Sequence, residues 1–213
     1  MGLTIKFNSN LEGSFDRMVK NSKYIDRRAI VDKAVTVGSG TRIWAFSRVV
    51  EGAVIGDDCN ICDHTFIEGK VTIGNRVTVK CGVYLWDGLV VEDDVFIGPN
   101  ATFTNDLRPR SRRQISSYLI TRLHQGCSVG AGAVVLPGLT IGRWSMVAAG
   151  AVVTRDVHDH ALVVGNPAHF RAWVCRCGDK LNFGNSPHAY CSCNVAYTRL
   201  SATHIEEDTL HES

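Results

Sequence analysis

Aliphatic or aromatic residues occupy every sixth position along one long stretch of the chain, and no polar residue interrupts the series. A second series of small or mostly aliphatic residues precedes it by two positions. A period of six fits neither an amphipathic helix nor an isolated two-sided strand, but it fits a chain wound into a three-walled coil. The first series is Val31, Val37, Ile43, Val49, Ile55, Ile61, Ile67, Ile73, Val79, Leu85, Val91, Ile97 and Phe103; the second is Ala53, Cys59, Thr65, Val71, Val77, Val83, Leu89, Val95 and Ala101.

This pattern predicts an all-β fold, a parallel β-helix with one hexad on each wall. Gly38, Gly56 and Gly74 recur every eighteen residues, which is three hexads and one full turn. Successive turns would lie about 4.8 Å apart and be joined by parallel-strand hydrogen bonds. The inward side chains would then form one continuous core.

The hexad frame stops at Phe103 and resumes at Leu123, and these positions are not a multiple of six apart. We therefore expect a loop, 105–122, within a coil domain of 31–170, and long loops of this kind are commonly functional. Residues 1–30 are interpreted as an N-terminal cap, with a short helix over Ser14–Lys23 that covers the exposed first turn.

Two further segments follow the coil. Residues 171–200 are rich in cysteine and resemble a zinc ribbon, whereas 201–213 are polar and acid-rich. Such a composition cannot bury enough apolar surface to fold, so we expect a disordered tail.

Composition narrows the function classes. The chain has 213 residues, a formal net charge of +2 and no basic stripe, so neither nucleic acid nor a membrane is expected as a partner. The N-terminus shows no apolar run of signal-peptide length, and we expect a cytoplasmic protein. In that compartment its eight cysteines would be reduced thiols, core residues or metal ligands.

Outward-facing polar residues gather beside the loop when the chain is laid on an eighteen-residue turn. We expect these polar residues on one flank of the coil, with His64 at a corner and a Trp, acids and amides along the wall. Cys81, at a corner beside this flank, is interpreted as a packing residue at a subunit contact, because no activating base is evident near it. The candidate residues are His64, Glu68, Trp86, Asp87, Asn105 and Asp106, together with the loop arginines Arg108, Arg110, Arg112 and Arg113.

Two hexad-containing stretches, Val54–Cys59 and Val129–Val134, resemble those of the hexapeptide-repeat acyltransferases, which implies a left-handed coil. The segments Val79–Gly88 and Glu92–Asp106 look like the subgroup that acetylates the 3-amino group of nucleotide-linked dideoxy amino sugars. Relatives acting on uronic-acid sugars carry Asn-Asn where this chain has Cys81-Gly82. The resemblance thus favours the branch that uses dTDP-linked 3-amino-3,6-dideoxyhexoses, with UDP sugars as the lesser candidate.

The resemblance also implies roles for individual residues. Acetyl-CoA would be the acetyl donor, and His64 would take a proton from the sugar amine, oriented by Glu68 or Asp63. Trp86, Asp87, Asn105, Asp106 and Arg110 would bind the nucleotide sugar. The backbone at Ala149 and Gly150 would hold the pantetheine arm, and Arg155 and Arg171 the CoA phosphates. The active site would lie between subunits of a homotrimer.

Four cysteines near the C-terminus form two pairs separated by thirteen residues: Cys175 and Cys177, then Cys191 and Cys193. The grouping has the look of a zinc ribbon, although one residue rather than two stands inside each pair. A structural zinc is favoured over four free thiols. Four thiolates would close the coordination shell and leave no water for catalysis.

Three alternatives remain to be weighed. A zinc-dependent carbonic anhydrase on this fold needs histidines on neighbouring turns, but Phe46 and Gly82 occupy the positions one turn from His64. An O-acetyltransferase acting on a sugar or small-molecule hydroxyl would need a firmer general base. A non-enzymatic β-helix used as an assembly module would bind no acetyl-CoA and would not explain the polar flank.

Overall fold

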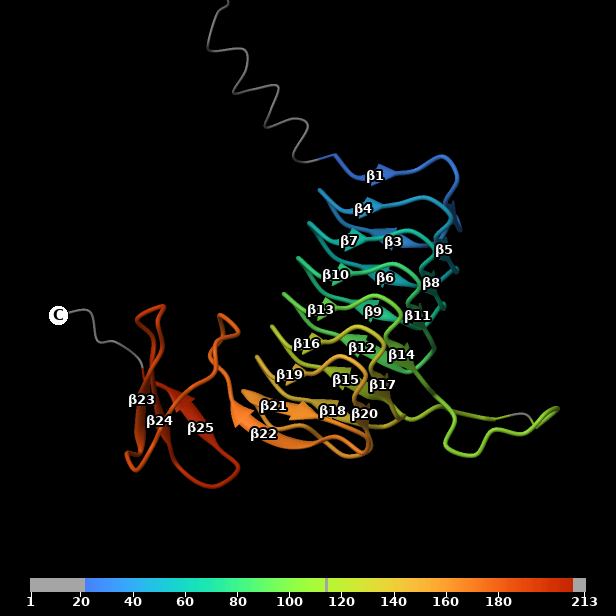
Figure 1. Ribbon diagram of the computed structural model, residues 1–213. Helices are drawn as coiled ribbons and strands as arrows, with labels where there is room; N and C mark the ends of the chain where they lie inside the picture. Colours follow the sequence, from blue (N-terminus) through green and yellow to red (C-terminus); the bar gives the residue numbers. More distant parts are fainter. Residues whose placement is uncertain (1–21, 114, 209–213) are drawn as a thin grey trace, which may run out of the picture.

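The computed structural model describes residues 22–113 and 115–208, and these residues form the predicted all-β parallel coil (Figure 1). Three sheets run along the coil as its walls, which we name A, B and C. Every strand of wall B or C, and every strand of wall A up to β21, pairs in parallel with the strand one turn away. No helix occurs among the described residues, and so none that could cross a membrane.

Most wall strands contain two residues, as one hexad per wall requires. Wall A contains β1 (Tyr24–Ile25), β4 (Arg42–Ile43), β7 (Asn60–Ile61), β10 (Thr78–Val79), β13 (Phe96–Ile97), β16 (Ser128–Val129), β19 (Met146–Val147), β21 (Ala161–Val164) and β22 (His169–Trp173). Wall B contains β2 (Ile30–Val31), β5 (Arg48–Val49), β8 (Phe66–Ile67), β11 (Tyr84–Leu85), β14 (Thr102–Phe103), β17 (Val134–Val135) and β20 (Val152–Val153). Wall C contains β3 (Thr36–Val37), β6 (Val54–Ile55), β9 (Thr72–Ile73), β12 (Leu89–Val91), β15 (Thr121–Leu123) and β18 (Thr140–Ile141).

Both predicted inward series form the core. From Ile43 to Phe103 every residue of the first series is buried, as is every residue of the second. Thr65 is the one polar residue of that second series, and its hydroxyl donates to the Cys62 carbonyl at 2.7 Å, so its burial leaves no unpaired donor. Burying one aliphatic side chain contributes roughly 1.5–3 kcal/mol, and the repeat multiplies that gain at every hexad.

Glycines recur where adjacent turns approach most closely. A Cβ on Gly56 would lie 2.6 Å from the Gly74 carbonyl oxygen, so no larger residue fits without moving the backbone. Beside these glycines, the Asn75 side chain accepts from the Asp57 amide at 2.9 Å, and the Asp93 side chain accepts from the Asn75 amide at 2.8 Å. These bonds satisfy backbone donors at the corner between walls C and A.

The loop leaves the coil after β14 and returns at β15. Leu123 pairs with Val91, so the hexad frame resumes where the sequence predicts. The returning limb packs close to the coil, because a Cβ on Gly88 would lie 2.7 Å from the Leu119 carbonyl oxygen. The intervening residues project away from the coil as an arm (Figure 1).

Two boundaries differ from the sequence interpretation. Strands β1 and β2 already belong to walls A and B, so the coil begins inside the segment read as a cap; most of the helix expected over Ser14–Lys23 lies outside the described residues. Residues 201–213, expected to lack order, contain strand β25 (Ile205–Glu207). It pairs with β24 (Ala196–Arg199), which also pairs with β23 (His188–Tyr190). Burial of Ile205 beneath this small sheet explains the difference.

Candidate functional site

His64 belongs to a column of residues along the corner between walls A and B. Each member occupies the same place in its turn, and consecutive turns are joined by backbone bonds: the amides of Gly82, Asn100, Gly132 and Gly150 donate to the preceding turn at 2.9–3.3 Å. Every member has a positive φ, the conformation that lets the chain turn this corner. We call this set the corner column; its members are Phe46, His64, Gly82, Asn100, Gly132 and Gly150.

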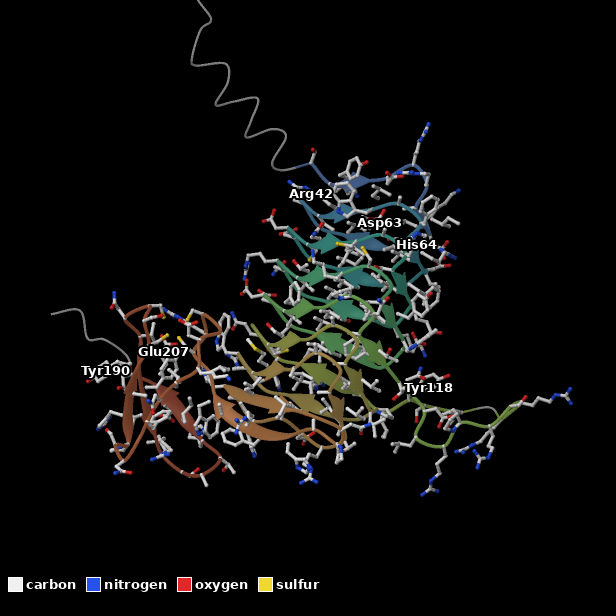
Figure 2. The ribbon with its side chains drawn as sticks, in the orientation of Figure 1. Arg42, Asp63, His64, Tyr118, Tyr190 and Glu207 are labelled. Carbon is white, nitrogen blue, oxygen red and sulfur yellow. The ribbon has the colours of Figure 1, made fainter. Side chains whose placement is uncertain are left out.

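The His64 side chain is exposed (Figure 2). Its ring stacks on Phe46 with centroids 5.0 Å apart and planes at 19°. The Arg28 guanidinium lies 5.1 Å from the centre of the same Phe46 ring. Arg28 also pairs with Asp26 at 2.9 Å, and this hydrogen bond holds the pKa of the Asp26 carboxyl well below its usual range. An accessible imidazole is thus held by an aromatic neighbour at the rim of the corner.

Small residues continue the corner column below His64. A Cβ built on Gly132 or on Gly150 would meet no atom within 4 Å. Gly150 lies four turns from His64, about 19 Å at 4.8 Å per turn. Ala149 is exposed beside it. The fold therefore places the predicted cofactor residues Ala149 and Gly150 on the same corner as His64, with open space at Gly132 and Gly150 and the Asn100 side chain over Gly82 between Gly132 and His64.

Glu68, Trp86, Asp87 and Asn105 lie at the other edge of wall B, where it meets wall C. The Glu68 carboxylate accepts from the Asp87 amide at 2.7 Å, and the Asp87 carboxylate accepts from the Lys70 amide at 2.8 Å. Trp86, Asp87 and Asn105 line a small cavity with Leu119 of the returning loop. Both carboxylates thus hold the backbone of neighbouring turns.

The residues expected on one flank therefore lie at the two edges of wall B, with His64 at one edge and Glu68 at the other. Four residues of extended chain separate His64 from Glu68, about 13 Å at 3.3 Å per residue. Glu68 consequently lies too far away to orient the His64 ring. Asp63 adjoins His64 in the same corner and is half-buried.

Aromatic side chains cover wall B between these two edges. Phe66 lies 5.3 Å from Trp86 and 6.4 Å from Tyr84, and Tyr84 lies 6.0 Å from Trp86, all between ring centroids. Tyr84 is half exposed. Sequence reasoning missed Phe66 and Tyr84, although their spacing of eighteen residues already stacks them on one wall. Together with Trp86 they form an aromatic band.

The arm forms a second recess. Asn105, Asp106, Arg108, Arg113 and Leu119 line a groove of about 290 Å³ together with other arm residues. The Asp106 carboxylate accepts from the Arg108 amide at 2.8 Å and shapes the start of the arm. Arg110 does not line this groove; its guanidinium donates to the Pro109 carbonyl at 2.9 Å and is exposed. Tyr118 lies where the arm rejoins the coil (Figure 2).

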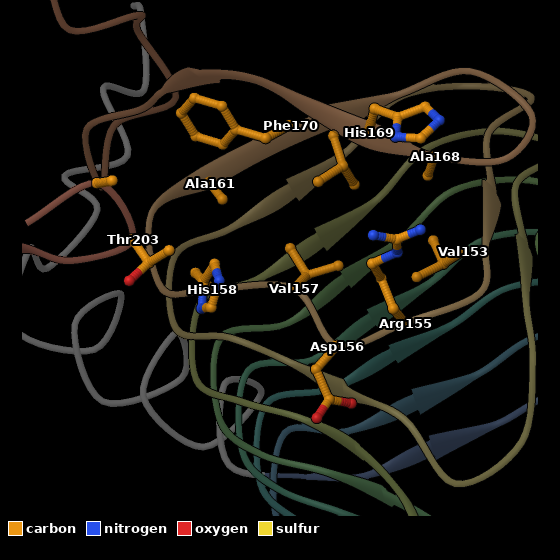
Figure 3. Close-up of a pocket in the computed structure, with 12 residues that line it drawn as sticks. Val153, Arg155, Asp156, Val157, His158, Ala161, Ala168, His169, Phe170 and Thr203 are labelled. Carbon is orange, nitrogen blue, oxygen red and sulfur yellow. The ribbon is translucent and has the colours of Figure 1, made fainter.

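A larger pocket lies at the C-terminal end of the coil (Figure 3), and we call it the end pocket. Its volume is about 430 Å³. Val153, Val157, Val163 and Phe170 contribute apolar lining, and its polar members are Arg155, Asp156, His158, His169 and Thr203. Of the two arginines predicted for the CoA phosphates, Arg155 lines the pocket, whereas Arg171 is exposed on β22 and does not line it.

The four C-terminal cysteines converge as predicted, and among the described residues theirs is the one group of three or more potential metal ligands. All four sulfurs lie within 4.8 Å of one another, and two pairs, Cys175 with Cys193 and Cys177 with Cys191, are 3.4 Å apart. Four zinc–sulfur bonds of 2.3 Å in a tetrahedron would give sulfur–sulfur distances of about 3.8 Å. The four thiols and the distances between their sulfurs fit a metal ion that binds thiolates in a tetrahedron.

Local contacts shift the pKa values of these thiols in different directions. The Cys193 amide donates to the Cys191 sulfur and lowers the pKa of that thiol to about 7. Burial raises the pKa of Cys175 to about 12, although the Tyr197 hydroxyl donates to its sulfur at 3.3 Å. A bound dication would reverse the effect of burial and stabilise the thiolate.

Comparison with known proteins adds to this geometry. The bacterial transferase hexapeptide family (six repeats) matches residues 34–69 and 120–155. The chain is 49% identical over 174 residues to the dTDP-3-amino-3,6-dideoxy-alpha-D-galactopyranose 3-N-acetyltransferase of Aneurinibacillus thermoaerophilus, covering 82% of this chain and 90% of the relative. It is 32% identical over 106 residues to the galactoside O-acetyltransferase of Lactococcus lactis, covering 44% and 51%. A solved AntD variant, an N-acyltransferase from Bacillus cereus in complex with dTDP and coenzyme A, is 15% identical with a TM-score of 0.48, covering 80% of this chain and 91% of that one.

The chain therefore belongs to the hexapeptide-repeat transferases. The extent and identity of the first match place it in the same family as the Aneurinibacillus enzyme. The resemblance that the hexads carry is confirmed, and so is the parallel coil that it implies.

Proposed function

We propose that this protein transfers the acetyl group of acetyl-CoA to the 3-amino group of a dTDP-linked 3-amino-3,6-dideoxyhexose. The relative that shares 49% of its residues over most of both chains is named for this reaction class. Cys81-Gly82, in place of the Asn-Asn pair typical of uronate-sugar enzymes, favours the same branch.

One structural observation supports the proposal: the open strip of the corner column at Gly150 and Gly132, on the same corner as His64. An extended pantetheine arm needs such a strip, because side chains would block its approach to the backbone. Gly132 and Gly150 leave that space free. The arm would run along the corner and present its thioester near the exposed His64 imidazole.

The reaction follows from this placement. The neutral sugar amine attacks the thioester carbonyl carbon, a C–N bond forms, and the C–S bond breaks as the CoA thiolate departs. The amine loses one proton, which His64 accepts and passes to the thiolate. A positioned base of this kind contributes typically 10²- to 10⁴-fold to the rate. Asp63, the neighbour of His64 in the corner, is the better candidate to orient the ring, because Glu68 holds the Asp87 amide instead.

The nucleotide sugar would bind on wall B. The aromatic band of Phe66, Tyr84 and Trp86 offers a surface on which a base or a sugar ring can stack. Asp87, Asn105 and Asp106 would supply polar contacts at the edge of the band, and the arm arginines, Arg110 included, would approach the diphosphate. Across β20 from the Gly150 end of the donor strip, Arg155 in the end pocket would contact a CoA phosphate, and Arg171, exposed on β22, is a second candidate.

The same proposal includes a homotrimer. The arm exposes apolar side chains, with Leu107 at 60%, Ile120 at 54% and Leu119 at 48% exposure. Such a projecting apolar surface is expected to be covered by another molecule. A neighbouring subunit that packs against the arm would bring its own edge of wall B toward His64, and the two separated sites would complete one another.

Two accessory features complete the proposal. One zinc ion would bind Cys175, Cys177, Cys191 and Cys193 in a closed, structural site. Unpaired thiols elsewhere, such as buried Cys59 and Cys127, suit a reducing compartment, which favours the cytoplasm.

The proposal is tested by measuring thiol release from acetyl-CoA with a panel of nucleotide sugars. We expect CoA release with dTDP-3-amino-3,6-dideoxyhexoses, and slower release with UDP-linked amino sugars. The matched 3-hydroxy sugars separate the O-acetyltransferase alternative, since the proposal predicts no release with them. Release with hydroxy sugars alone would overturn the amine acceptor, and absence of release with every sugar would overturn the function.

A further inference from the structure

The C-terminal module, residues 181–208, lies at the end of the coil, and its strands share no sheet with the coil (Figure 1). Strand β22 belongs to wall A, and the Val174 amide then donates to the His160 carbonyl at 2.8 Å. Strands β23, β24 and β25 pair only with one another among the described strands. Ladder hydrogen bonds therefore do not fasten this small sheet to the coil.

The four cysteines lie on the two sides of this junction. Cys175 and Cys177 follow β22 directly and belong to the coil side, whereas Cys191 and Cys193 lie in the connection between β23 and β24. The closest sulfur pairs cross the junction: Cys175 with Cys193 and Cys177 with Cys191, each at 3.4 Å. An ion at their centre would bridge coil and sheet.

The two cysteine turns are built alike. In the first, the Gly178 amide donates to the Cys175 carbonyl at 2.9 Å and the Cys175 amide to the Asp179 carbonyl at 2.8 Å. In the second, the corresponding bonds run from Asn194 to Cys191 at 3.0 Å and from Cys191 to Val195 at 2.9 Å.

The residue after each second cysteine has a positive φ, 98° at Gly178 and 66° at Asn194. The two turns have the same hydrogen bonds, and each carries two thiols. The first cysteine of each turn lies closest to the second cysteine of the other, so the two turns together supply the four ligands of one tetrahedral ion. The single residue between the cysteines of each pair is thus accommodated by a turn that both pairs share.

Donors around the sulfurs support the same assignment. The Tyr197 hydroxyl donates to the Cys175 sulfur at 3.3 Å, and the Arg176 amide donates to the Tyr197 oxygen at 3.0 Å. Tyr197 is fully buried, and its ring lies 5.2 Å from that of His160 in the coil. Hydrogen bonds to ligand sulfurs of this kind orient metal ligands and tune the site.

Other contacts also cross the junction: the Leu181 amide donates to the Trp173 carbonyl at 2.9 Å, the Ser192 hydroxyl donates to the Asp179 carboxylate at 2.5 Å, and the apolar residues of the module join the buried cluster of the coil. Arg176 pairs with Glu207 at 3.0 Å, but the Arg176 side chain is 51% exposed, so solvent screens this pair. The module buries a small apolar set: Leu181, Phe183, Ala189, Tyr197 and Ile205. Folded units below about 40 residues usually need a metal, a disulfide or a partner for stability. The thiols here form no disulfide, and four of them converge, which favours the metal.

The module also contributes to the end pocket. Ala202 and Thr203, in the connection between β24 and β25, line the pocket with Arg155 and Phe170 of the coil (Figure 3). The position of these two residues at the end pocket depends on how the module is held against the coil.

We propose that the zinc ion on Cys175, Cys177, Cys191 and Cys193 is the fastener of the C-terminal module, and that it completes the end pocket by holding Ala202 and Thr203 against the coil. This inference rests on the zinc of the proposed function and not on the acetyl acceptor. Removing the ion releases β23–β25 and opens the pocket, while the coil keeps its structure.

The test measures zinc content and hydrogen exchange of the full-length chain in parallel. Protein purified under reducing conditions should contain one zinc per chain. Extraction with a chelator should speed amide exchange in 188–208 by orders of magnitude, leave the coil strands of 60–103 unchanged, and be reversed by added zinc. Both readouts are independent of acetyl transfer, so a failed activity assay and a failed metal assignment remain distinguishable.

Variants separate the ion from the cysteine side chains. Cys191→Ser with Cys193→Ser should lose the zinc and show the same exchange pattern, whereas Cys81→Ser, which changes an exposed cysteine of the coil, should retain one zinc per chain. A purified chain that binds no zinc after reconstitution would overturn the site. Zinc loss without faster exchange in 188–208 would overturn the fastening role.

Discussion

The coil and the C-terminal module are stabilised in different ways. Each interior turn of the coil is hydrogen-bonded to the turn on either side, and its inward residues, such as Ile61 and Ile97, are wholly buried. The module buries a small apolar set, and four sulfurs face one another where it meets the coil. The coil is therefore held together by packing and backbone hydrogen bonds, whereas we propose that the module also needs a bound ion to keep its place at the end pocket.

The comparison predicts that catalysis belongs to the coil. His64→Ala should lower kcat/KM for the amino sugar by about 10²- to 10⁴-fold, because the amine loses its positioned proton acceptor. His188→Ala serves as the matched control, since His188 is exposed in the module and contacts Thr198. Steady-state thiol release measures both. Equal rates for His64→Ala and the wild type would show that the departing thiolate alone takes the proton.

The same truncation should have different consequences in the two regions. Ile97→Ala removes a buried side chain between two turns of the coil and should lower the free energy of unfolding by about 2–5 kcal/mol. Ile205→Ala should leave the main unfolding transition in place and loosen the module alone. Urea denaturation followed by far-UV circular dichroism measures the first effect, and hydrogen exchange in 188–208 the second. A shared loss in both variants would contradict the independence of coil and module.

A bulky side chain in the corner column should block the donor strip without disturbing the core. Gly132→Leu places a side chain in open space and should raise KM for acetyl-CoA more than tenfold, which corresponds to about 1.4 kcal/mol. Gly184→Leu is the control, because Gly184 also has a positive φ and open space around its Cβ position but lies in the module. An unchanged KM in Gly132→Leu would place the donor elsewhere.

The smallest effect concerns charges on the corner between walls C and A. The Arg76 guanidinium donates to Asp94 at 2.6 Å, and this hydrogen bond lowers the pKa of the Asp94 carboxyl. A carboxyl with a lowered folded-state pKa stabilises the fold above its unfolded value of 3.8, and that contribution disappears as the pH falls through the folded value. Arg76→Ala should therefore be slightly less stable than wild type at pH 7 and equal to it in strong acid, as urea titrations at several pH values would measure. Arg122→Ala, on an exposed arginine, should show no such pH dependence.

The core was predictable because the hexad period repeats one physical requirement, an inward apolar residue, at every wall. Ile61, Val79 and Leu123 therefore lie where the period predicts. The convergence of the four cysteines followed from their pairing, since thiols in two close pairs are typical of one metal site.

The arrangement of the candidate site residues was harder to predict. The period assigns Glu68 and Trp86 to one outward column but does not state how far His64 lies across the wall. About 13 Å of extended chain separates the two edges, so residues that share a flank in sequence need not share a site. The roles of Arg110 and Arg171 depend on the arm and on the β21–β22 hairpin, which have no repeat to locate them.

Strand β25 was missed for a related reason. Residues 205–207 are Ile-Glu-Glu, and a single buried Ile205 among charged neighbours is too weak a local signal for a strand. Its order depends on pairing with β24, a contact that composition does not reveal.

Mapping where acetyl-CoA lies tests the central claim most directly. A CoA thioester analogue with a photoreactive diazirine on its pantetheine arm can be cross-linked to the full-length protein and the modified residues identified by mass spectrometry. The account predicts labelling at 130–132 and 148–150, competed by acetyl-CoA and lost in Gly132→Leu. Competed labelling confined to wall C or to the C-terminal module would contradict it.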